Sequence, residues 1–230
     1  MSMRHQFDLS SYLVIGPENT NGRPVAHIIA EALRAGFTFA QIRAKHAEAA
    51  EIIRLARAAA DAIAGQKKSD EVALVINDRL DVVLAARELR IKVDGVHVGQ
   101  EDIPPAVCRK YLGVNAVIGL SARTSDLINY VESCDTSCID YFGAGPLHAT
   151  ATKPDAGMDQ NGKIVTCSLD ELRALHRVSP LPVVVGGGVK ADDLPALRAT
   201  GVDGFFVVSA VAGAEHPYTA AKELVRCWHS

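Results

Sequence analysis

Two hydrophobic patterns alternate along the chain. Short runs rich in Val, Ile and Leu are separated by longer Ala- and Leu-rich stretches in which apolar residues recur at helical spacing. Because strands of repeated βα units are buried on both faces, this alternation predicts a parallel sheet covered by helices. The predicted strands are residues 12–15, 39–42, 72–76, 95–98, 116–119, 138–142, 182–185 and 204–207. The predicted helices are residues 24–35, 47–64, 79–89, 104–111, 124–133, 169–176, 194–200 and 217–228.

Two architectures share this alternation, a closed barrel and a doubly wound open sheet. A dinucleotide-binding open sheet usually carries a G-x-G-x-x-G turn after its first strand, whereas Gly16-Pro17 follows the first predicted strand here. The glycine-rich turns come after the sixth and seventh predicted strands instead. The sequence therefore predicts an α/β fold, a (β/α)8 TIM barrel that occupies residues 1–230 as a single domain.

One predicted connection is much longer than the others. Residues 143–165 contain Gly, Pro, Thr, Lys and Asp without a sustained hydrophobic period. Connections of this length inside a compact domain are usually functional. We therefore expect this segment to contribute to a site.

Composition and charge exclude several classes of partner. The formal net charge of −3 gives no long-range attraction to nucleic acid or to an anionic membrane. No apolar run reaches the length of a membrane span, the first nine residues lack a signal core, and the five cysteines form no CxxC pair. We expect a cytoplasmic enzyme that acts on small molecules, without a nucleic-acid or membrane partner. A homo-oligomer is left open, because exposed helix faces such as residues 47–64 could pack against a partner.

Polar side chains gather where the predicted strands end, and in a barrel this is the face that carries the chemistry. Gln41, Arg43 and Lys45 alternate along the chain at the end of the second predicted strand, so an amide and two cations fall on one side. Solvation is the commoner fate of such cations. The other polar residues after strand ends include Ser121, Thr150, Thr152 and Lys153.

Two carboxylates also follow strand ends. Asn77-Asp78 comes after the third predicted strand and Asp102 after the fourth. Singly, each could merely cap the helix that follows. Together they suit Mg²⁺, which prefers few protein oxygens plus the phosphate oxygens of a substrate. With the cations at neighbouring strand ends, they predict a Mg²⁺-dependent pyrophosphate site.

A second anion site is predicted where the seventh and eighth strands end. Residues 184–189 contain three consecutive glycines, and residues 207–210 follow the last strand. Barrels often bind a phosphate there with backbone N–H groups, and glycine lets the backbone approach closely. Three glycines alone could serve only to tighten a turn. The prediction of an anion site therefore depends on where they lie, at the end of the seventh predicted strand.

Several of these segments resemble the thiamine phosphate synthase (thiamine-phosphate pyrophosphorylase) family, from residue 12 to about residue 213. The resembling segments are 41–45 (QIRAK), 76–79 (INDR), 94–104 (DGVHVGQEDIP), 119–121 (GLS), 140–155 (DYFGAGPLHATATKPD), 187–188 (GG) and 207–211 (VVSAV). The resemblance implies a reaction that joins hydroxymethylpyrimidine diphosphate to thiazole phosphate, giving thiamine phosphate and pyrophosphate, with Mg²⁺ as cofactor.

The resemblance also implies roles for individual residues. The diphosphate would be held by Arg43, Lys45, Asn77 and Lys153 with Gln41 beside them, and Mg²⁺ by Asp78 and Asp102. Ser121 would lie near the reacting pyrimidine and the leaving group, so that Ser121, Lys153 and Arg43 form the catalytic set. The thiazole phosphate would contact Thr150 and Thr152, with backbone contacts from Gly188, Val208 and Ser209.

The chain departs from the family pattern at several positions. Ile15-Gly16 stands where the family commonly has Thr-Asp, Ala149 replaces Pro, Arg123 replaces His, and Gly186 replaces an apolar residue. His97 lies inside a strand motif, so we expect it to be structural and hydrogen-bonded within the barrel.

Two alternatives come with this resemblance. A related barrel catalyses thiazole tautomerisation without Mg²⁺, but it typically lacks the Asn-Asp pair and the acidic Gly-Gln-Glu-Asp segment that are present here. A non-catalytic relative that binds thiamine phosphates is the other, and Ile15-Gly16 and Ala149 are the features in its favour.

Overall fold

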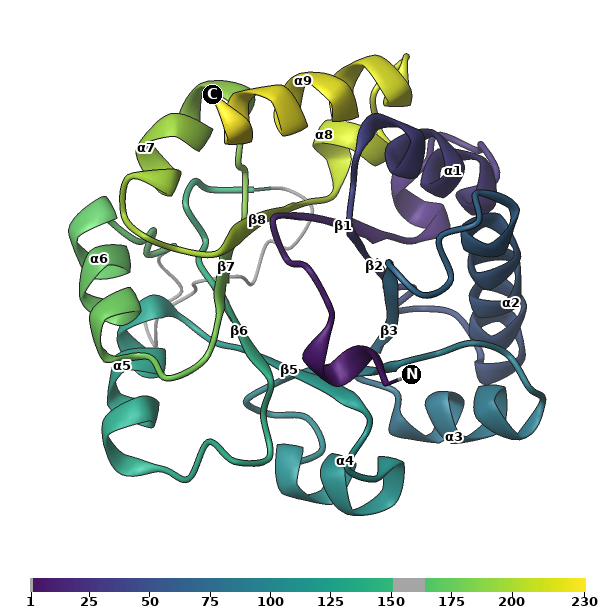
Figure 1. Ribbon diagram of the computed structural model, residues 1–230, viewed down its shortest axis with the longest axis horizontal. Coiled ribbons are helices and arrows are strands. Elements are labelled where there is room, and N and C mark those ends of the chain that lie inside the picture. Colours follow the sequence, from purple (N-terminus) through teal and green to yellow (C-terminus); the bar gives the residue numbers. More distant parts are fainter. Residues whose placement is uncertain (1, 151–163) are drawn as a thin grey trace.

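The strands form the predicted closed barrel. In the part of the chain that the computed structural model describes, residues 2–150 and 164–230, eight parallel strands follow one another around the barrel in sequence order (Figure 1). The barrel closes because Tyr12 pairs with Phe39 on one side and with Phe206 on the other. This closure confirms the TIM barrel and excludes the open sheet. The strands are β1 (Ser11–Ile15), β2 (Phe39–Ile42), β3 (Ala73–Asn77), β4 (Gly95–Gly99), β5 (Val117–Ser121), β6 (Tyr141–Ala144), β7 (Val183–Val185) and β8 (Gly204–Val207).

Helices surround the barrel and return the chain from the end of one strand to the start of the next (Figure 1). α6 begins with a capping box, in which Ser168 Oγ accepts a hydrogen bond from the Glu171 amide and the Glu171 carboxylate accepts one from the Ser168 amide. Among the described residues, no helix combines the length and apolar character needed to cross a membrane. The α-helices are α1 (Val25–Ala35), α2 (Ala49–Gly65), α3 (Leu80–Glu88), α4 (Pro105–Leu112), α5 (Thr124–Ser133), α6 (Leu169–Val178), α7 (Leu194–Arg198), α8 (Ser209–Ala212) and α9 (Pro217–His229).

Some predicted boundaries differ from the observed ones. β6 begins at Tyr141 rather than at residue 138. The Asp140 carboxylate accepts the Ile118 amide at 2.7 Å and pairs with Arg4 and Arg109, so this residue anchors the entry to the strand. The sequence pattern missed α8, because four residues are too few to show a helical period.

Two hydrophobic cores lie on opposite faces of the barrel wall. The larger one fills the space between strands and helices, and includes Phe205, whose ring is 6.0 Å from Phe37 and 5.6 Å from Trp228 between centroids. The smaller one fills the barrel interior, where the next residue, Phe206, faces Tyr12 at 6.1 Å. The alternation along β8 therefore divides its side chains between the two cores.

The N-terminal segment crosses the barrel before β1 begins (Figure 1). Met3 and Leu9 are buried, and the Phe7 ring packs 6.0 Å from both Phe39 and Tyr141. The Arg4 guanidinium binds Asp140 at 2.7 Å and fixes the segment in place. Because these residues precede β1, they fill the end of the barrel opposite the one where the strands terminate, and this contribution was not predicted.

Candidate active site

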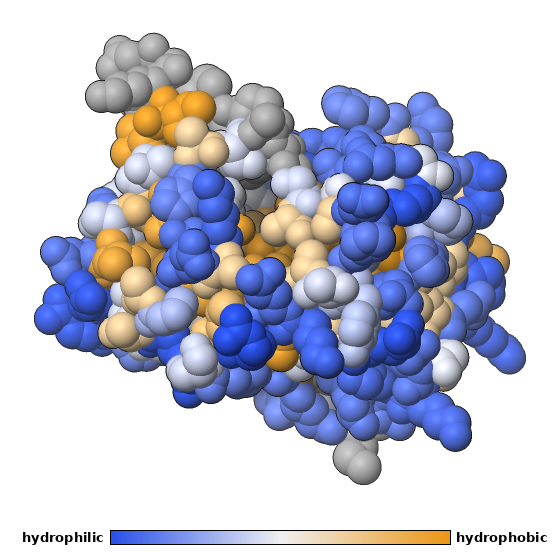
Figure 2. Space-filling view, turned by 90° about the horizontal axis from the view of Figure 1, so that it is seen from above, coloured by the Kyte–Doolittle hydropathy of each residue, from blue (hydrophilic) through white to orange (hydrophobic). Residues whose placement is uncertain are grey.

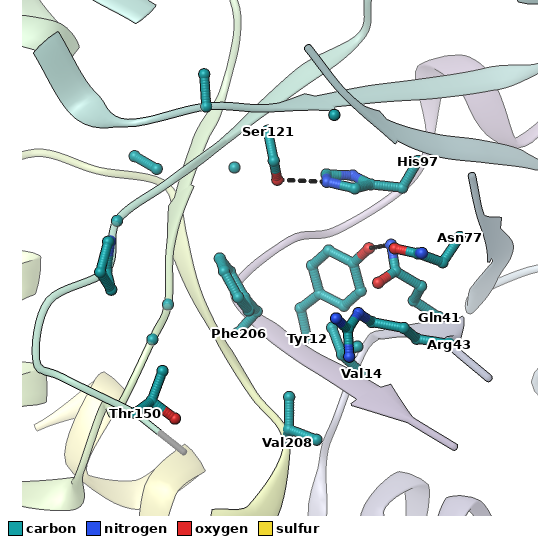
Figure 3. Close-up of a pocket in the computed structure, with 18 of the residues that line it drawn as sticks. Tyr12, Val14, Gln41, Arg43, Asn77, His97, Ser121, Thr150, Phe206 and Val208 are labelled. Carbon is teal, nitrogen blue, oxygen red and sulfur yellow. Dashed lines mark hydrogen bonds between the residues drawn. The ribbon is translucent and has the colours of Figure 1, made fainter. Parts of the chain in front are cut away.

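A cavity of about 590 Å³ opens at the carboxyl ends of the strands. Figure 2 shows the outer surface as a mosaic of polar and apolar residues, and Figure 3 shows side chains from several strands pointing into the cavity. Eleven of the residues predicted to form the site line it, namely Gln41, Arg43, Lys45, Asn77, Asp78, Asp102, Ser121, Thr150, Gly188, Val208 and Ser209. Thr152 and Lys153 lie outside the described residues.

The two predicted carboxylates come together at the mouth of this cavity. Burial is the largest cause that raises the pKa of Asp78 from 3.8 to about 6, and the neighbouring Asp102 carboxylate raises it further while Lys45 and Arg43 lower it. Asn77 Nδ2 donates to Asp78 Oδ2 at 2.5 Å and orients this carboxylate. Asp78 and Asp102 therefore lie within one electrostatic environment together with two cations.

Neither carboxylate caps a helix. Arg79 is the N-cap residue of α3 and Pro104 that of α4, and neither helix has a side-chain cap. Asp102 Oδ2 instead accepts the Gly99 amide at 2.7 Å, which holds the loop after β4 against the end of that strand. The capping alternative raised by the sequence is wrong for both residues.

The backbone of Asp78 adopts an unusual conformation. Its φ of 61° lies in the left-handed region, which costs a non-glycine residue roughly 1 kcal/mol or more. The Asp78 amide donates to His97 O at 2.8 Å, extending the β3–β4 pairing beyond the strand. Because such strain persists where the surroundings impose it, it supports a functional role for this carboxylate.

The two cations at the end of β2 face the same cavity. The Arg43 amide donates to Ile15 O at 2.8 Å, so the β1–β2 hydrogen bonding continues past the last residue of β2. This bond fixes the backbone position of Arg43. Ala44 is buried on the other side, which confirms the predicted alternation of Arg43 and Lys45 toward the cavity.

A chain of hydrogen bonds crosses the cavity floor. Gln41 Nε2 donates to Tyr12 Oη at 2.9 Å, and Tyr12 Oη lies 3.0 Å from Tyr141 Oη. Tyr141 Oη lies 2.8 Å from His97 Nδ1, and His97 Nε2 lies 2.5 Å from Ser121 Oγ (Figure 3). The expectation that His97 is hydrogen-bonded within the barrel is confirmed.

The start of this chain sets its direction. An amide N–H can only donate, so Tyr12 accepts from Gln41 and keeps its own proton for Tyr141. If each proton serves one hydrogen bond, the Tyr141 hydroxyl donates to His97 Nδ1, and the His97 Nε2–H group donates to Ser121 Oγ. Burial raises the pKa of both tyrosines, which keeps them neutral. With the protons arranged in this way, the Ser121 hydroxyl would direct its own proton at the cavity.

Sequence reasoning missed the part that the two tyrosines play. Tyr12 and Tyr141 are fully buried and sit in apolar strand runs, where the sequence pattern gives no sign of a polar role. The available signal was positional, since each of these hydroxyl-bearing side chains lies on the inward face of its strand.

Two glycine-containing loops meet on the other side of the cavity. Gly187 and Gly188 have φ values of 82° and 73°, which strongly favour glycine. The loop after β6 packs on them, because the Leu147 amide donates to Gly186 O and the His148 amide to Gly187 O, both at 2.9 Å. Val208 precedes α8 at the neighbouring strand end.

The departures from the family pattern have different consequences for the site. Ile15 is buried in the core between strands and helices, and a Cβ on Gly16 would lie 2.0 Å from Arg43 O, so neither residue lines the cavity. Ala149 is exposed and also lies outside the cavity lining. Arg123 and Gly186 do line it, and Arg123 Nε binds Asp126 at 2.7 Å.

Comparison with known proteins gives a consistent result. Residues 11–211 match the family described as thiamine monophosphate synthase. A thiamine-phosphate synthase of Moorella thermoacetica is 36% identical over 219 residues, covering 95% of this chain and 94% of the relative. One from Azorhizobium caulinodans is 36% identical over 222 residues, covering 96% of both chains.

Solved structures agree with the sequence relatives. Thiamine phosphate pyrophosphorylase from Pyrococcus furiosus has a TM-score of 0.76 and 27% identity, covering 99% of this chain and 98% of that one. 3-Hexulose-6-phosphate synthase has a TM-score of 0.63 at 15% identity, a likeness of fold alone.

Proposed function

Because the chain belongs to the thiamine monophosphate synthase family, we propose that it joins hydroxymethylpyrimidine diphosphate to thiazole phosphate at the barrel mouth, releasing pyrophosphate with the help of Mg²⁺. The observation that carries this proposal is the placement of Asp78 and Asp102 side by side, close to Arg43 and Lys45. A site with acidic and basic groups in contact suits a ligand made of a diphosphate and its metal.

The residues present fit Mg²⁺ held jointly with substrate. Among the residues that the structure describes, no group of three His, Cys, Asp or Glu side chains could hold a metal without further ligands. Asp78 and Asp102 would supply two hard oxygens, and diphosphate oxygens and water would complete the shell. Bound in this way, Mg²⁺ would neutralise charge that develops on the leaving diphosphate.

The protein side chains would act mainly on the leaving group. Breaking the bond between the pyrimidinylmethyl carbon and the diphosphate oxygen leaves an electron-rich cation, so most of the barrier concerns charge on the departing diphosphate. Arg43 and Lys45 would bind that charge, together with Asn77 and, from the sequence alone, Lys153. The Ser121 proton, directed by His97, would be donated in a hydrogen bond to the departing oxygen.

The second substrate needs positioning rather than activation. The thiazole nitrogen carries its own lone pair, so no general base is required. The phosphate of this substrate would be bound by the backbone at Gly188, Val208 and Ser209, with Thr150 and, from the sequence alone, Thr152 beside it. Remote binding of this kind holds the nitrogen in line with the reacting carbon.

The proposal is tested by supplying both substrates with and without Mg²⁺ and measuring pyrophosphate and thiamine phosphate. Asp78→Asn should abolish Mg²⁺-dependent turnover. Asp81→Asn is the matched control, since Asp81 is 61% exposed and pairs with Arg79 at the surface. Absence of pyrophosphate release by the unaltered protein would refute the proposal, and full activity of Asp78→Asn would refute the metal assignment.

The tautomerase alternative is disfavoured by the same carboxylates, since that reaction uses no Mg²⁺. It predicts that added chelator leaves isomerisation of a thiazole substrate unchanged. We also propose a cytoplasmic location, consistent with five cysteines that are all free thiols. Cell fractionation tests this location, and recovery outside the cytoplasm would contradict it.

A further inference from the structure

Three glycines on the inner face of the barrel wall each leave room for a large neighbour. A Cβ on Gly119 would lie 2.3 Å from the Tyr141 ring, and one on Gly143 would lie 2.5 Å from Ser121 Oγ. A Cβ on Gly186 would lie 2.1 Å from two carbons of the Phe206 ring. These distances are far below van der Waals contact, so each glycine is required by what stands next to it.

For Gly186 the requirement comes from sterics and not from the backbone. Its φ is not in the left-handed region, in contrast to Gly187 and Gly188, which follow it. In the β7–β8 register Val185 pairs with Phe205, so the next pair is Gly186 and Phe206. The missing side chain at Gly186 is the space that the Phe206 ring occupies.

Phe206 forms the upper surface of the barrel's inner core. The residues beneath it, Val184 and Tyr141, are completely buried, whereas Phe206 is only partly buried and lines the cavity. Its ring lies beside Tyr12, with 6.1 Å between centroids, and both side chains line the cavity (Figure 3). The cavity floor therefore has an aromatic part next to its hydrogen-bonded part.

We propose that Phe206 is a specificity-determining residue that admits the flat pyrimidine ring of the diphosphate substrate and rejects rings with bulkier substituents. This inference rests on the proposed function. A pyrimidine has polar edges and apolar faces, and the floor matches both, with Gln41 for an edge and Phe206 for a face. The thiazole partner is held chiefly through its phosphate at the loops above.

The size of the effect follows from how apolar pockets discriminate. One methylene group in such a pocket changes discrimination by about 10- to 200-fold. Phe206→Ala removes the ring and leaves Gly186 in place, so the floor gains space that no neighbouring side chain fills. The preference for the natural ring over a larger one should therefore fall by about tenfold or more.

The experiment compares two pyrimidine diphosphates, the natural substrate and an analogue whose ring carries a larger alkyl group. Dissociation constants are measured by titration calorimetry with Mg²⁺, and KM for thiazole phosphate is measured in parallel. The variants are Phe206→Ala, Phe206→Leu, Gly186→Ala and the Gly186→Ala/Phe206→Ala double variant. Phe205→Leu is the control, because Phe205 is the adjacent ring on the outward face.

The expected pattern has three parts. Phe206→Ala brings the ratio of the two dissociation constants closer to one, and Phe206→Leu does so to a smaller extent. Phe205→Leu leaves this ratio unchanged. Gly186→Ala weakens binding of the natural diphosphate. The double variant loses less binding free energy than the sum of the two single variants, because the Cβ added at position 186 no longer meets the Phe206 ring. KM for thiazole phosphate changes much less than the ratio of the two dissociation constants does.

Each contrary result overturns a defined part. The inference is refuted if both Phe206 variants fold and keep the ratio of the two dissociation constants unchanged. It is also refuted if these variants change only the KM for thiazole phosphate. In either case, product formation by the unaltered protein would still uphold the proposed function. If the unaltered protein binds neither diphosphate, the inference and the proposed function fail together.

Discussion

Asp78 and Asp102 lie side by side at the barrel mouth, and burial together with the Asp102 carboxylate raises the pKa of Asp78 to about 6. This relationship makes the pair costly to keep ionised without a bound cation. The same feature that suits the pair to a metal therefore works against the stability of the metal-free protein.

Asp78→Asn should stabilise the metal-free protein at neutral pH. The folded-state pKa of about 6 exceeds the ordinary value of 3.8, so between these pH values the folded state binds more protons than the unfolded state. Stability therefore falls as pH rises through this window, and the penalty is fully present above it. Urea unfolding without divalent cations should show the variant more stable than the unaltered protein at pH 8 and equal to it below pH 3.8. A stability difference that is the same at both pH values would contradict this account.

Ser121→Ala should reduce kcat by about 100-fold, the usual effect of removing one hydrogen-bond donor to developing charge. The melting temperature should change little, because the hydroxyl lies at the cavity surface. Ser133→Ala is the control, since that hydroxyl is exposed at the end of α5, where it donates to Asn129 O. Equal kcat in the two variants would remove Ser121 from the reaction.

Tyr141→Phe should disturb His97 as well as the fold. Tyr12 Oη and His97 Nδ1 would both lose a buried partner, at a cost of about 1–3 kcal/mol in the free energy of unfolding. Nitrogen NMR of labelled histidine should show His97 with its proton on Nε2 in the unaltered protein and a mixture of tautomers in the variant. Tyr111→Phe, at a position that is 59% exposed, should change neither measurement. A proton on Nδ1 in the unaltered protein would reverse the proposed direction of the chain.

Asp140→Ala should destabilise the fold by about 3 kcal/mol, because it leaves Arg4 and Arg109 without a shared buried carboxylate. Arg4→Ala should cost less, since the Asp140–Arg109 pair survives. Asp170→Ala, which breaks the exposed pair with Arg173, is the control and should have little effect. Unfolding by urea measures all three, and a small effect of Asp140→Ala would show that this carboxylate is not what fixes the N-terminal segment in place.

The fold could be predicted because its strands are short apolar runs with polar residues at one end. β2 and β8 begin and end as predicted, since β2 is buried along its whole length and β8 at every residue except Phe206, which is partly buried. The N-terminal segment could not be predicted, because Met3, Phe7 and Leu9 are isolated apolar residues with no period. Their burial depends on a barrel that forms elsewhere in the sequence.

The residues of the site could be predicted from their positions along the strands, but the contacts between their side chains could not. Gln41 and Ser121 lie near the ends of β2 and β5 and Asp78 directly follows β3, and these strand ends meet on one face in any barrel. The hydrogen bonds that join Gln41 to Ser121 through two tyrosines involve five strands, and no local pattern records which inward side chains touch. The fit between Gly186 and Phe206 is hidden for the same reason, because the residues are 20 positions apart.

The N-terminal segment has a consequence for the order of events in catalysis. Met3, Phe7 and Leu9 fill one end of the barrel, so the cavity is blind at its base and is entered from the strand ends. A molecule on the floor, against Phe206 and Gln41, is covered by any molecule that binds above it. If the pyrimidine diphosphate lies on this floor with the thiazole phosphate above it, as we propose, the diphosphate must bind first, and saturation with thiazole phosphate would slow its entry.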